Sequence, residues 1–509
     1  MGWGRGIVGD LSIFFISVKE MGLLWKCGLR SWFMNRDLPI IIQGGMGAGV
    51  SSWTLANAVS KAGQLGVVSG TALDVLLARR LQVGDPGGHM RRALSKFPIP
   101  DVAQRIIDKY FIEGGKADDA AFKSKPMPAL KPSKHLEELL VAANFVEVFL
   151  AKEGHDGPVG INFLEKIQIP NLPSIYGAML AGVSYVLMGA GIPKAIPGIL
   201  DQLADNQRVE MRIDVQGLDA GEEVNTSFDP NAFFGGEAPK VGRPDFLAII
   251  ASATLGSMLA RRASGKVNGF VIEGPSAGGH NAPPRGKMQL SVEGEPIYND
   301  RDYANLEEIK KIGLPFWLAG SYAEPGRVTE ALQAGAAGVQ IGTAFAYCNE
   351  SGMSAELIDA AMKLSIKKEA KVFTDPVASP TGFPFKVLEM EGTQSEQSIY
   401  EARTRICDLG YLRHAYKKEN GKIGLRCPSE PVEDYLKKGG KIEDTVGRKC
   451  VCNGLMANID LGQVQKDGLL ELPLITSGDD VADIARFLKD GATSYTAQDV
   501  IDYLLADQV

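Results

Sequence analysis

From residue 39 to about residue 350, short apolar runs alternate with amphipathic stretches along the chain. The apolar runs are rich in Val, Ile and Leu, and several end in glycine, as buried parallel strands with tight following loops do. The amphipathic stretches, among them 53–63, 254–264 and 326–335, repeat apolar residues at helical spacing. This alternation is typical of parallel sheets covered by helices.

The pattern predicts eight strands, at 39–45, 65–70, 158–164, 184–190, 246–252, 268–274, 314–320 and 337–343. Eight strand–helix units favour an α/β fold of the (β/α)8 TIM barrel type. The alternative is an open, doubly wound sheet. Its dinucleotide signature is missing, because the glycine-rich stretch GGMGAGVSS contains no G-x-G-x-x-G in register.

Longer interruptions predict additions to the barrel. Residues 71–157 exceed a single crossover helix and predict a helical insertion after the second strand. Residues 206–242 predict a β excursion before the fifth strand, although VEMRIDV within it is also compatible with a barrel strand. The pattern changes again near residue 350. We therefore expect a barrel domain at 34–350 and a C-terminal extension, cap or lid at 351–509.

The first 33 residues differ from the rest of the chain. They are apolar and aromatic, but they contain neither a clear charged leader nor an A-x-A cleavage site. A poorly formed signal peptide and a short interfacial helix are both compatible with this composition. Since MNRDLPIIIQGG, which begins at Met34, reads as the natural start of the fold, residues 1–33 are interpreted as an N-terminal extension outside the core.

The amino-acid composition indicates a globular protein and excludes several other classes. The chain has 509 residues, of which 45% are hydrophobic and 23% charged, so it is long enough for a large core. A net charge of −7 argues against nucleic acid as a partner. No apolar run reaches the ~20 residues of a membrane span. Six cysteines do not make a disulfide scaffold in so long a chain, and they suit a cytoplasmic protein. Assembly into a homo-oligomer is compatible with these properties.

A single histidine stands out in the segment EGPSAGGHNAPPRG, residues 273–286, directly after the sixth predicted strand. In a TIM barrel the chemistry lies on the loops after the strands. Gly278 and Gly279 allow close approach of a ligand, and a histidine with a pKa near 6.5 can transfer protons at neutral pH. We therefore interpret His280 as a catalytic residue. The structural alternative is that it only hydrogen-bonds its own loop.

Two further loops predict a phosphate-binding site. The seventh and eighth strands end in Gly320-Ser321 and Gly342-Thr343, at the usual phosphate position of the fold. These glycines could instead simply close turns. After the first strand, glycines surround Met46 and allow the main chain to pass against a flat ring, although this methionine could also fill a gap in the core.

The motifs PIIIQGGMG, LGVVSG, EGPSAGGH and AGVQIGTAF together resemble the FMN-dependent nitronate monooxygenases, once called 2-nitropropane dioxygenases. The same superfamily includes FMN-dependent enoyl-ACP reductases and the flavin enoyl reductases of polyunsaturated fatty-acid synthases. The resemblance covers roughly residues 37–350. It is specific for an FMN barrel and much less specific for the substrate.

The resemblance implies a role for individual residues. It makes His280 the catalytic histidine of the A-G-G-H motif and places Gly279 near the cofactor. The family pattern usually continues His-x-Gly, whereas Asn281 and Ala282 follow here, so the loop after the histidine differs. The remaining FMN contacts that it implies, first at the ring and then at the phosphate, are Gly44, Gly45, Met46 and Asn162, and Gly320, Ser321, Gly342 and Thr343.

The resemblance also implies a reaction. A nitronate monooxygenase oxidises an alkyl nitronate with O2 to a carbonyl compound and nitrite, and His280 would remove the α-proton of a neutral nitroalkane. The alternative is an enoyl-thioester reductase that uses NAD(P)H. A third hypothesis is a flavin-binding protein whose C-terminal cap contacts a partner. In both enzymes the substrate is a small molecule and the flavin carries the redox chemistry.

Other residues were considered for chemistry. Lys166 and Arg285 could attract an anionic substrate, and Glu273 could orient the histidine loop. The C-terminal cysteines could bind zinc or an iron–sulfur cluster, but they lack paired C-x-x-C motifs, so we predict no metal and interpret them as buried thiols. These cysteines are Cys407, Cys427, Cys450 and Cys452.

Overall fold

The computed structural model describes residues 1, 38–466 and 468–508. The chain divides into two compact units, residues 1–39 and 40–509. Apart from Met1, the predicted N-terminal extension at 1–33 lies outside the described residues, as do residues 34–37. The second unit contains every helix and strand discussed below.

The second unit is built on a parallel sheet of eight strands, in the order β1-β11-β10-β9-β8-β4-β3-β2. Two backbone hydrogen bonds join its ends: Gln43 N donates to Leu65 O at 2.9 Å, and Leu65 N donates to Ile41 O at 3.1 Å. The sheet is therefore a nearly closed barrel, which confirms the predicted fold over the open-sheet alternative. The strands are β1 Ile41–Gln43, β2 Gly66–Ser69, β3 Val159–Leu164, β4 Tyr185–Gly189, β8 Asp245–Ile250, β9 Gly269–Glu273, β10 Phe316–Ala319 and β11 Gly338–Ile341.

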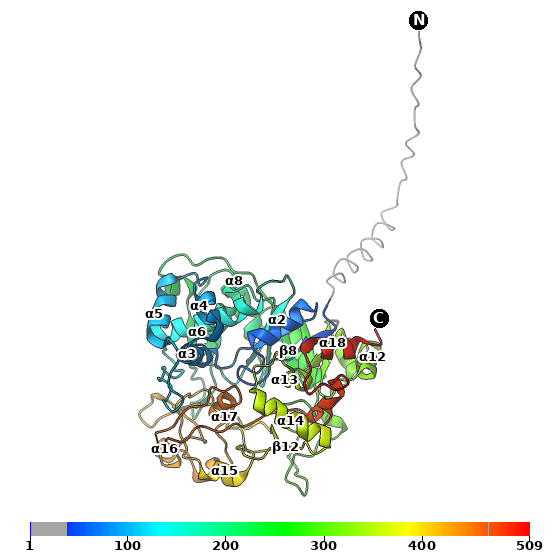
Figure 1. The fold of residues 1–509 in the computed structure, drawn as a ribbon. Helices are drawn as coiled ribbons and strands as arrows, with labels where there is room; N and C mark the ends of the chain where they lie inside the picture. Colours follow the sequence, from blue (N-terminus) through cyan, green and yellow to red (C-terminus); the bar gives the residue numbers. More distant parts are fainter. Residues whose placement is uncertain (2–37, 467, 509) are drawn as a thin grey trace. The chain divides into compact units, whose positions relative to one another are not determined.

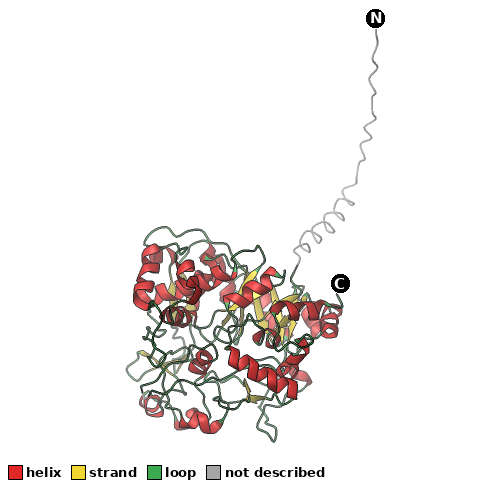
Figure 2. Cartoon of the chain, viewed as in Figure 1, coloured by secondary structure: helices red, strands yellow, loops and turns green. Residues whose placement is uncertain are grey.

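Apolar side chains fill both sides of this sheet. Because successive residues of a strand face opposite sides, continuous apolar strands supply an inner core and an outer layer at once. The inner cluster includes Ile42, Val67, Leu187 and Trp317, all at most 1% exposed. The outer layer packs against helices, which surround the yellow strands in Figure 2.

Helices follow the barrel strands as the apolar spacing predicts. Ser52 and Ser252 accept hydrogen bonds from Leu55 N and Leu255 N and so cap the first turns of α2 and α10. The helices that follow the strands are α2 Trp53–Lys61, α7 Asn171–Leu180, α8 Ile196–Ala204, α10 Ala253–Arg262, α11 Leu306–Lys310, α12 Pro325–Gln333 and α13 Thr343–Ala346, and η2 Asp300–Asp302 is a short 3-10 turn.

Additional elements interrupt the barrel at two places (Figure 1). Between β2 and β3 lie α3 Leu73–Gln82, η1 Pro86–Gly88, α4 His89–Leu94, α5 Pro100–Tyr110 and α6 Lys134–Ala151. Before β8, β5 Val209–Arg212 pairs antiparallel with β7 Asn225–Phe228, and α9 Pro230–Phe234 follows. VEMRIDV is therefore not a barrel strand. Its last residue opens β6 Val215–Gln216, which pairs with β14 of the C-terminal region.

The C-terminal region packs small elements against the barrel. They are α14 Ala355–Lys367, the antiparallel pair β12 Val372–Asp375 and β13 Phe385–Leu388, α15 Gln397–Ala402, the antiparallel pair β14 His414–Lys417 and β15 Ile423–Arg426, α16 Val432–Lys437, η3 Ile442–Thr445, α17 Val451–Ala457, η4 Asp479–Phe487 and α18 Ala497–Leu505. The domain boundaries themselves remain predictions. Within the described residues, no helix combines the length and apolarity that a bilayer crossing requires.

Candidate active site

One cavity of about 190 Å³ lies at the carboxyl ends of the barrel strands. It is lined by all ten residues that the sequence analysis singled out for catalysis and cofactor binding. They come from strands and loops up to 299 positions apart in the chain, and only barrel closure brings them together. They are Gly44, Gly45, Met46, Asn162, Gly279, His280, Gly320, Ser321, Gly342 and Thr343.

The glycine loop after β1 is held by the hydroxyl of Ser51. This Oγ accepts from Met46 N at 2.8 Å and donates to Gly44 O at 2.9 Å. The side chain of Gln43, fully buried, links the same hydroxyl to the barrel, since its Oε1 accepts from Val67 N at 2.9 Å. These hydrogen bonds connect the loop to the barrel strands.

Two amide side chains face this cavity with unused acceptors. Asn162 Oδ1 and Gln340 Oε1 are buried and have no hydrogen-bond partner among the described residues. A Cβ on Gly45 would lie 2.4 Å from Asn162 Cβ, so only glycine fits beside this amide. Buried acceptors normally have partners. A flat ring that carries N–H groups, such as a flavin, would supply them, so these residues fit the expected cofactor.

The predicted phosphate loops contain two residues with positive φ. Gly320 has φ +99° and Ser321 has φ +56°, a left-handed conformation that a serine adopts only at a cost. Thr343 is the first residue of α13, directly after Gly342. Whether these loops hold a phosphate remains a prediction.

A C-terminal segment that sequence reasoning did not assign to the site closes this end of the cavity. Thr343 Oγ1 accepts from Gly478 N at 3.1 Å, and Thr476 Oγ1 accepts from Gly279 N at 3.0 Å. The carboxyl group of Asp480 hydrogen-bonds Ser321, and burial raises the pKa of Asp480 despite the nearby charge of Arg486. The only sequence signal was SGDD, which reads as a helix start.

His280 is enclosed by aromatic rings and by a hydroxyl from the C-terminal region. Its ring centroid lies 4.8 Å from that of Phe385 on β13, and its Nε2 lies 2.6 Å from Ser379 Oγ. Ser379 is fully buried and also contacts Thr381 Oγ1 at 2.8 Å. Burial lowers the pKa of His280 to about 4, so the imidazole is neutral at pH 7.

Glu273, the last residue of β9, is a second titratable group on the wall of this cavity. Burial raises its pKa to about 7, because its charged form loses water without gaining a counter-ion. This acid therefore changes protonation in the neutral range. Sequence reasoning assigned it only an orienting role, because position on a strand does not reveal desolvation.

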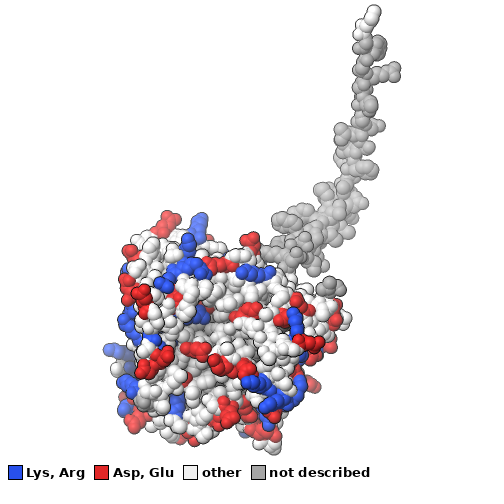
Figure 3. Space-filling view, viewed as in Figure 1, with Lys and Arg blue, Asp and Glu red and all other residues white. Residues whose placement is uncertain are grey.

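A larger cavity of about 600 Å³ adjoins the first one and shares Glu273 and His280 with it. Lys166 and Arg285, the two basic residues considered in the sequence analysis, lie on its wall. Lys166 Nζ stands 5.6 Å from the ring centroid of Phe383. Elsewhere acidic and basic side chains are interspersed on the face seen in Figure 3.

Comparisons with known proteins give one family match. Residues 202–410 match the family model described as nitronate monooxygenase, and no curated protein matches the chain. The matched part includes His280, Ser321, Thr343 and Ser379.

Several solved structures are similar to this chain. FabK from Thermotoga maritima has 17% identity over 92% of this chain and 92% of its own, with a TM-score of 0.44. Nitroalkane oxidase from Streptomyces ansochromogenes has 14% identity over 92% and 95%, with a TM-score of 0.45. The enoyl reductase domain of MlnA from Bacillus amyloliquefaciens has 11% identity over 94% and 98%, with a TM-score of 0.46. Over residues 202–410 the chain is thus similar to the nitronate monooxygenase family, which confirms the resemblance for the motifs EGPSAGGH and AGVQIGTAF within this range and supports a flavin-dependent oxidoreductase.

Proposed function

We propose that this protein is a cytoplasmic, FMN-dependent nitronate monooxygenase that oxidises alkyl nitronates with O2 to a carbonyl compound and nitrite. The observation that carries the proposal is the cavity at the barrel mouth, where a neutral histidine faces glycine loops and two unpaired amide oxygens of the described residues. The family match over residues 202–410 supports the same reaction class.

The residues that would hold FMN fall into two groups. Gly44, Gly45, Met46 and Asn162 would lie at the ring, and the loops at 320–321 and 342–343 would hold the phosphate. The bound flavin would supply electron transfer between the substrate and O2. Asn162 would contribute orientation, since its Oδ1 has no other partner among the described residues.

His280 would act as the base toward a neutral nitroalkane. A pKa of about 4 keeps its lone pair free at neutral pH. When Nε2–H donates to Ser379 Oγ, that lone pair is on Nδ1, for which the described residues supply no hydrogen-bond partner. A nitronate that is already an anion needs no base, so the two substrate forms separate the role of the histidine from that of the cofactor.

A specific observation favours a second candidate, an enoyl-thioester reductase that uses NAD(P)H. The adjoining cavity has a volume of about 600 Å³, which is typical of sites that bind drug-sized ligands. A short nitroalkane would fill only a small part of this volume. Lys166 and Arg285 on its wall could bind an anionic carrier group. Here Glu273, with a pKa of about 7, is a better proton donor than neutral His280.

Two assays on the purified flavoprotein test these reactions. We expect oxygen consumption with alkyl nitronates and no oxidation of NAD(P)H that depends on an enoyl thioester. The reverse result would assign the reductase, and no turnover in either assay with flavin bound would favour the binding-protein hypothesis.

The histidine is tested separately. His280→Ala should lose about 10²- to 10⁴-fold in activity toward neutral nitroalkane while it keeps flavin and nitronate oxidation. His155→Ala is the control, because among the described residues the ring of His155 hydrogen-bonds the backbone of Ala151 and Gly157 and lies outside the cavity. Equal losses with both substrate forms would remove the base role.

A further inference from the structure

Two hydroxyl groups connect the candidate base to a second cavity. His280 Nε2 lies 2.6 Å from Ser379 Oγ, and Ser379 Oγ lies 2.8 Å from Thr381 Oγ1. His280 lines the cavity at the barrel mouth, whereas Thr381 lines a cavity of about 530 Å³ formed by the β excursion and the C-terminal region. Ser379 is fully buried between them. The hydroxyls of Ser379 and Thr381 therefore bridge two cavities that have no lining residue in common.

The proposed reaction requires a route by which a proton leaves the base. A neutral nitroalkane carries one proton more than its nitronate, and both would give the same carbonyl compound and nitrite. Every turnover of the neutral form therefore releases one additional proton, and the base must lose it before it can act again. His280 also lines the two cavities that cofactor and substrate would fill, so bound ligands would displace water from that side of the ring. The contact of Nε2 with Ser379 offers another route.

The hydrogen bonds at Ser379 permit donation in either direction. Thr381 N donates to Ser379 Oγ at 3.3 Å and so takes one of the two lone pairs of this hydroxyl. One lone pair and one O–H hydrogen remain for His280 and for Thr381 Oγ1. Ser379 can therefore accept from Nε2–H and donate to Thr381 Oγ1, or do the reverse, and it is fully paired in both arrangements. A hydroxyl that relays a proton passes between these two arrangements.

Thr381 is placed to pass the proton on to water. It is half-buried, and its Oγ1 can accept from Phe383 N, at 3.4 Å, as well as from Ser379. These two donors occupy both of its lone pairs, so its own hydrogen can donate into the cavity that it lines. A cavity of about 530 Å³ has room for many water molecules, because one molecule needs about 10–15 Å³.

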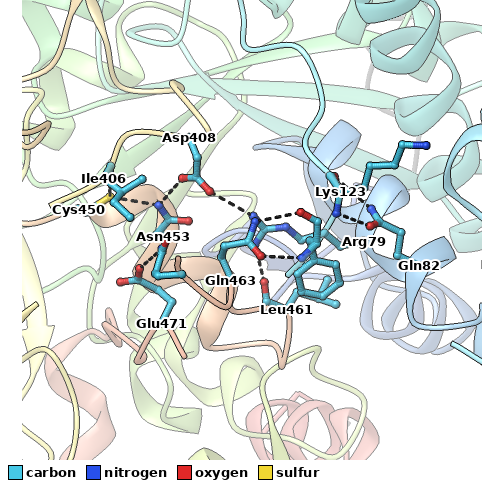
Figure 4. A network of polar contacts seen from close by, with 12 residues as sticks. Arg79, Gln82, Lys123, Ile406, Asp408, Cys450, Asn453, Leu461, Gln463 and Glu471 are labelled. Carbon is cyan, nitrogen blue, oxygen red and sulfur yellow. Dashed lines mark hydrogen bonds and ion pairs between the residues drawn. The ribbon is translucent and has the colours of Figure 1, made fainter. Parts of the chain in front are cut away.

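The segment that carries both hydroxyls is held by the C-terminal region. Arg448 Nη1 donates to Val377 O at 2.7 Å and to Ser379 O at 2.6 Å. Asn453, on the helix α17 that follows Arg448 closely in the chain, donates to Asp408 Oδ1 at 2.6 Å, as Figure 4 shows. The backbone of the segment is therefore held in place, whereas proton transfer along it requires only that the hydroxyls rotate.

We propose that Ser379 and Thr381 relay a proton from His280 to water in the cavity of about 530 Å³, an inference that rests on the proposed function. His280 Nδ1 takes the α-proton of the nitroalkane, and the electron pair of the C–H bond stays on the nitronate. Nε2–H then passes to Ser379 Oγ, while Ser379 gives its hydrogen to Thr381 Oγ1 and Thr381 gives its hydrogen to water. The imidazole is then neutral again. A half-turn of the ring and rotation of the two hydroxyls restore the starting arrangement.

Thr381→Val removes the outer hydroxyl with little change in shape and tests the relay. We expect kcat for a neutral nitroalkane to fall about tenfold and kcat for its nitronate to stay unchanged, because only the neutral form releases the additional proton. Free imidazole in the buffer should restore part of the rate, because it can take up the proton in place of the hydroxyl. Thr381→Ser keeps a hydroxyl and should keep the rate. Thr445→Val is the matched control, since Thr445 is buried elsewhere in the C-terminal region and its Oγ1 donates to Ile442 O.

A measurement without turnover tests the same route. The chain has five histidines, so the imidazole signals in an NMR spectrum of histidine-labelled protein are few, and His280→Ala identifies the signal of His280. We expect the exchange of its Nε2–H with water to be slower in Thr381→Val than in the unaltered protein, and unchanged in Thr445→Val.

The two measurements separate the relay from the proposed function. Equal losses of kcat with both substrate forms, or unchanged proton exchange in Thr381→Val, overturn the relay. If the unaltered protein oxidises neither substrate form, the proposed function fails, and the exchange rate at His280 still decides whether the hydroxyls carry protons. Thr381→Ala provides the same comparison where the valine variant does not fold.

Discussion

His280 Nε2 lies 2.6 Å from Ser379 Oγ, so the histidine at the barrel mouth is held by a hydroxyl 99 positions later in the chain. Ser379 is fully buried, and Thr381 Oγ1 contacts the same hydroxyl. This contact orients the imidazole ring at the barrel mouth.

Removal of the hydroxyl should weaken the base without removing the cofactor. With Ser379→Ala we expect kcat for a neutral nitroalkane to fall by about 5- to 10-fold, the equivalent of about 1 kcal/mol, because the imidazole loses its orienting hydrogen bond. Ser379→Thr should restore part of the rate. Steady-state kinetics with nitroalkane and nitronate provide the check, and an unchanged ratio between the two substrates would contradict the prediction.

The carboxyl group of Glu273 should produce pH dependence near neutrality. Its folded-state pKa of about 7 exceeds its usual value of 4.5, so the folded protein binds the extra proton. The resulting stabilisation is complete below pH 4.5 and is lost as pH rises through 7. We therefore expect Glu273→Gln to have a higher Tm than the unaltered protein at about pH 8. Near pH 4.5, the usual carboxyl pKa, we expect no such increase in Tm.

The control for this comparison is Glu293→Gln, which changes an exposed carboxylate. Thermal unfolding of all three proteins at the two pH values measures the effect. A Tm difference for Glu273→Gln that does not change with pH would show that the carboxyl group does not titrate in this range.

The close approach of Gly45 to Asn162 should make this glycine essential for the cavity. Gly45→Ala would place a Cβ 2.4 Å from Asn162 Cβ, which forces the loop or the amide to move. We expect a loss of about 1–3 kcal/mol in the free energy of unfolding, together with weaker flavin binding. Gly326→Ala on α12 has no atom within 4 Å of its new Cβ and should change neither quantity measurably. Denaturant titration and flavin fluorescence measure both.

Asp480 should oppose a phosphate at Ser321. Its carboxyl group hydrogen-bonds Ser321, where the phosphate is predicted to lie. With Asp480→Asn we expect FMN to bind about fivefold more tightly, because about 1 kcal/mol of charge repulsion is removed. Riboflavin, which has no phosphate, should bind equally to both proteins. If riboflavin affinity rises by the same factor, the phosphate does not lie beside this carboxylate.

The local pattern of apolar and polar residues was sufficient to predict the barrel and the loops that contain the candidate site residues. Buried parallel strands and amphipathic helices depend on residue spacing within one segment, so all eight strands were predictable. The glycines and His280 follow strand ends, and the barrel topology by itself brings such loops to one mouth. The motif resemblance then supplied the expected cofactor.

Only the tertiary structure placed the C-terminal region at the site. The packing of Ser379 and Asp480 depends on contacts between distant segments, and such contacts leave no periodic trace in the sequence. The shifted pKa values of His280 and Glu273 also depend on burial by that packing. Sequence periodicity is local, whereas desolvation and long-range hydrogen bonding exist only once the chain is folded.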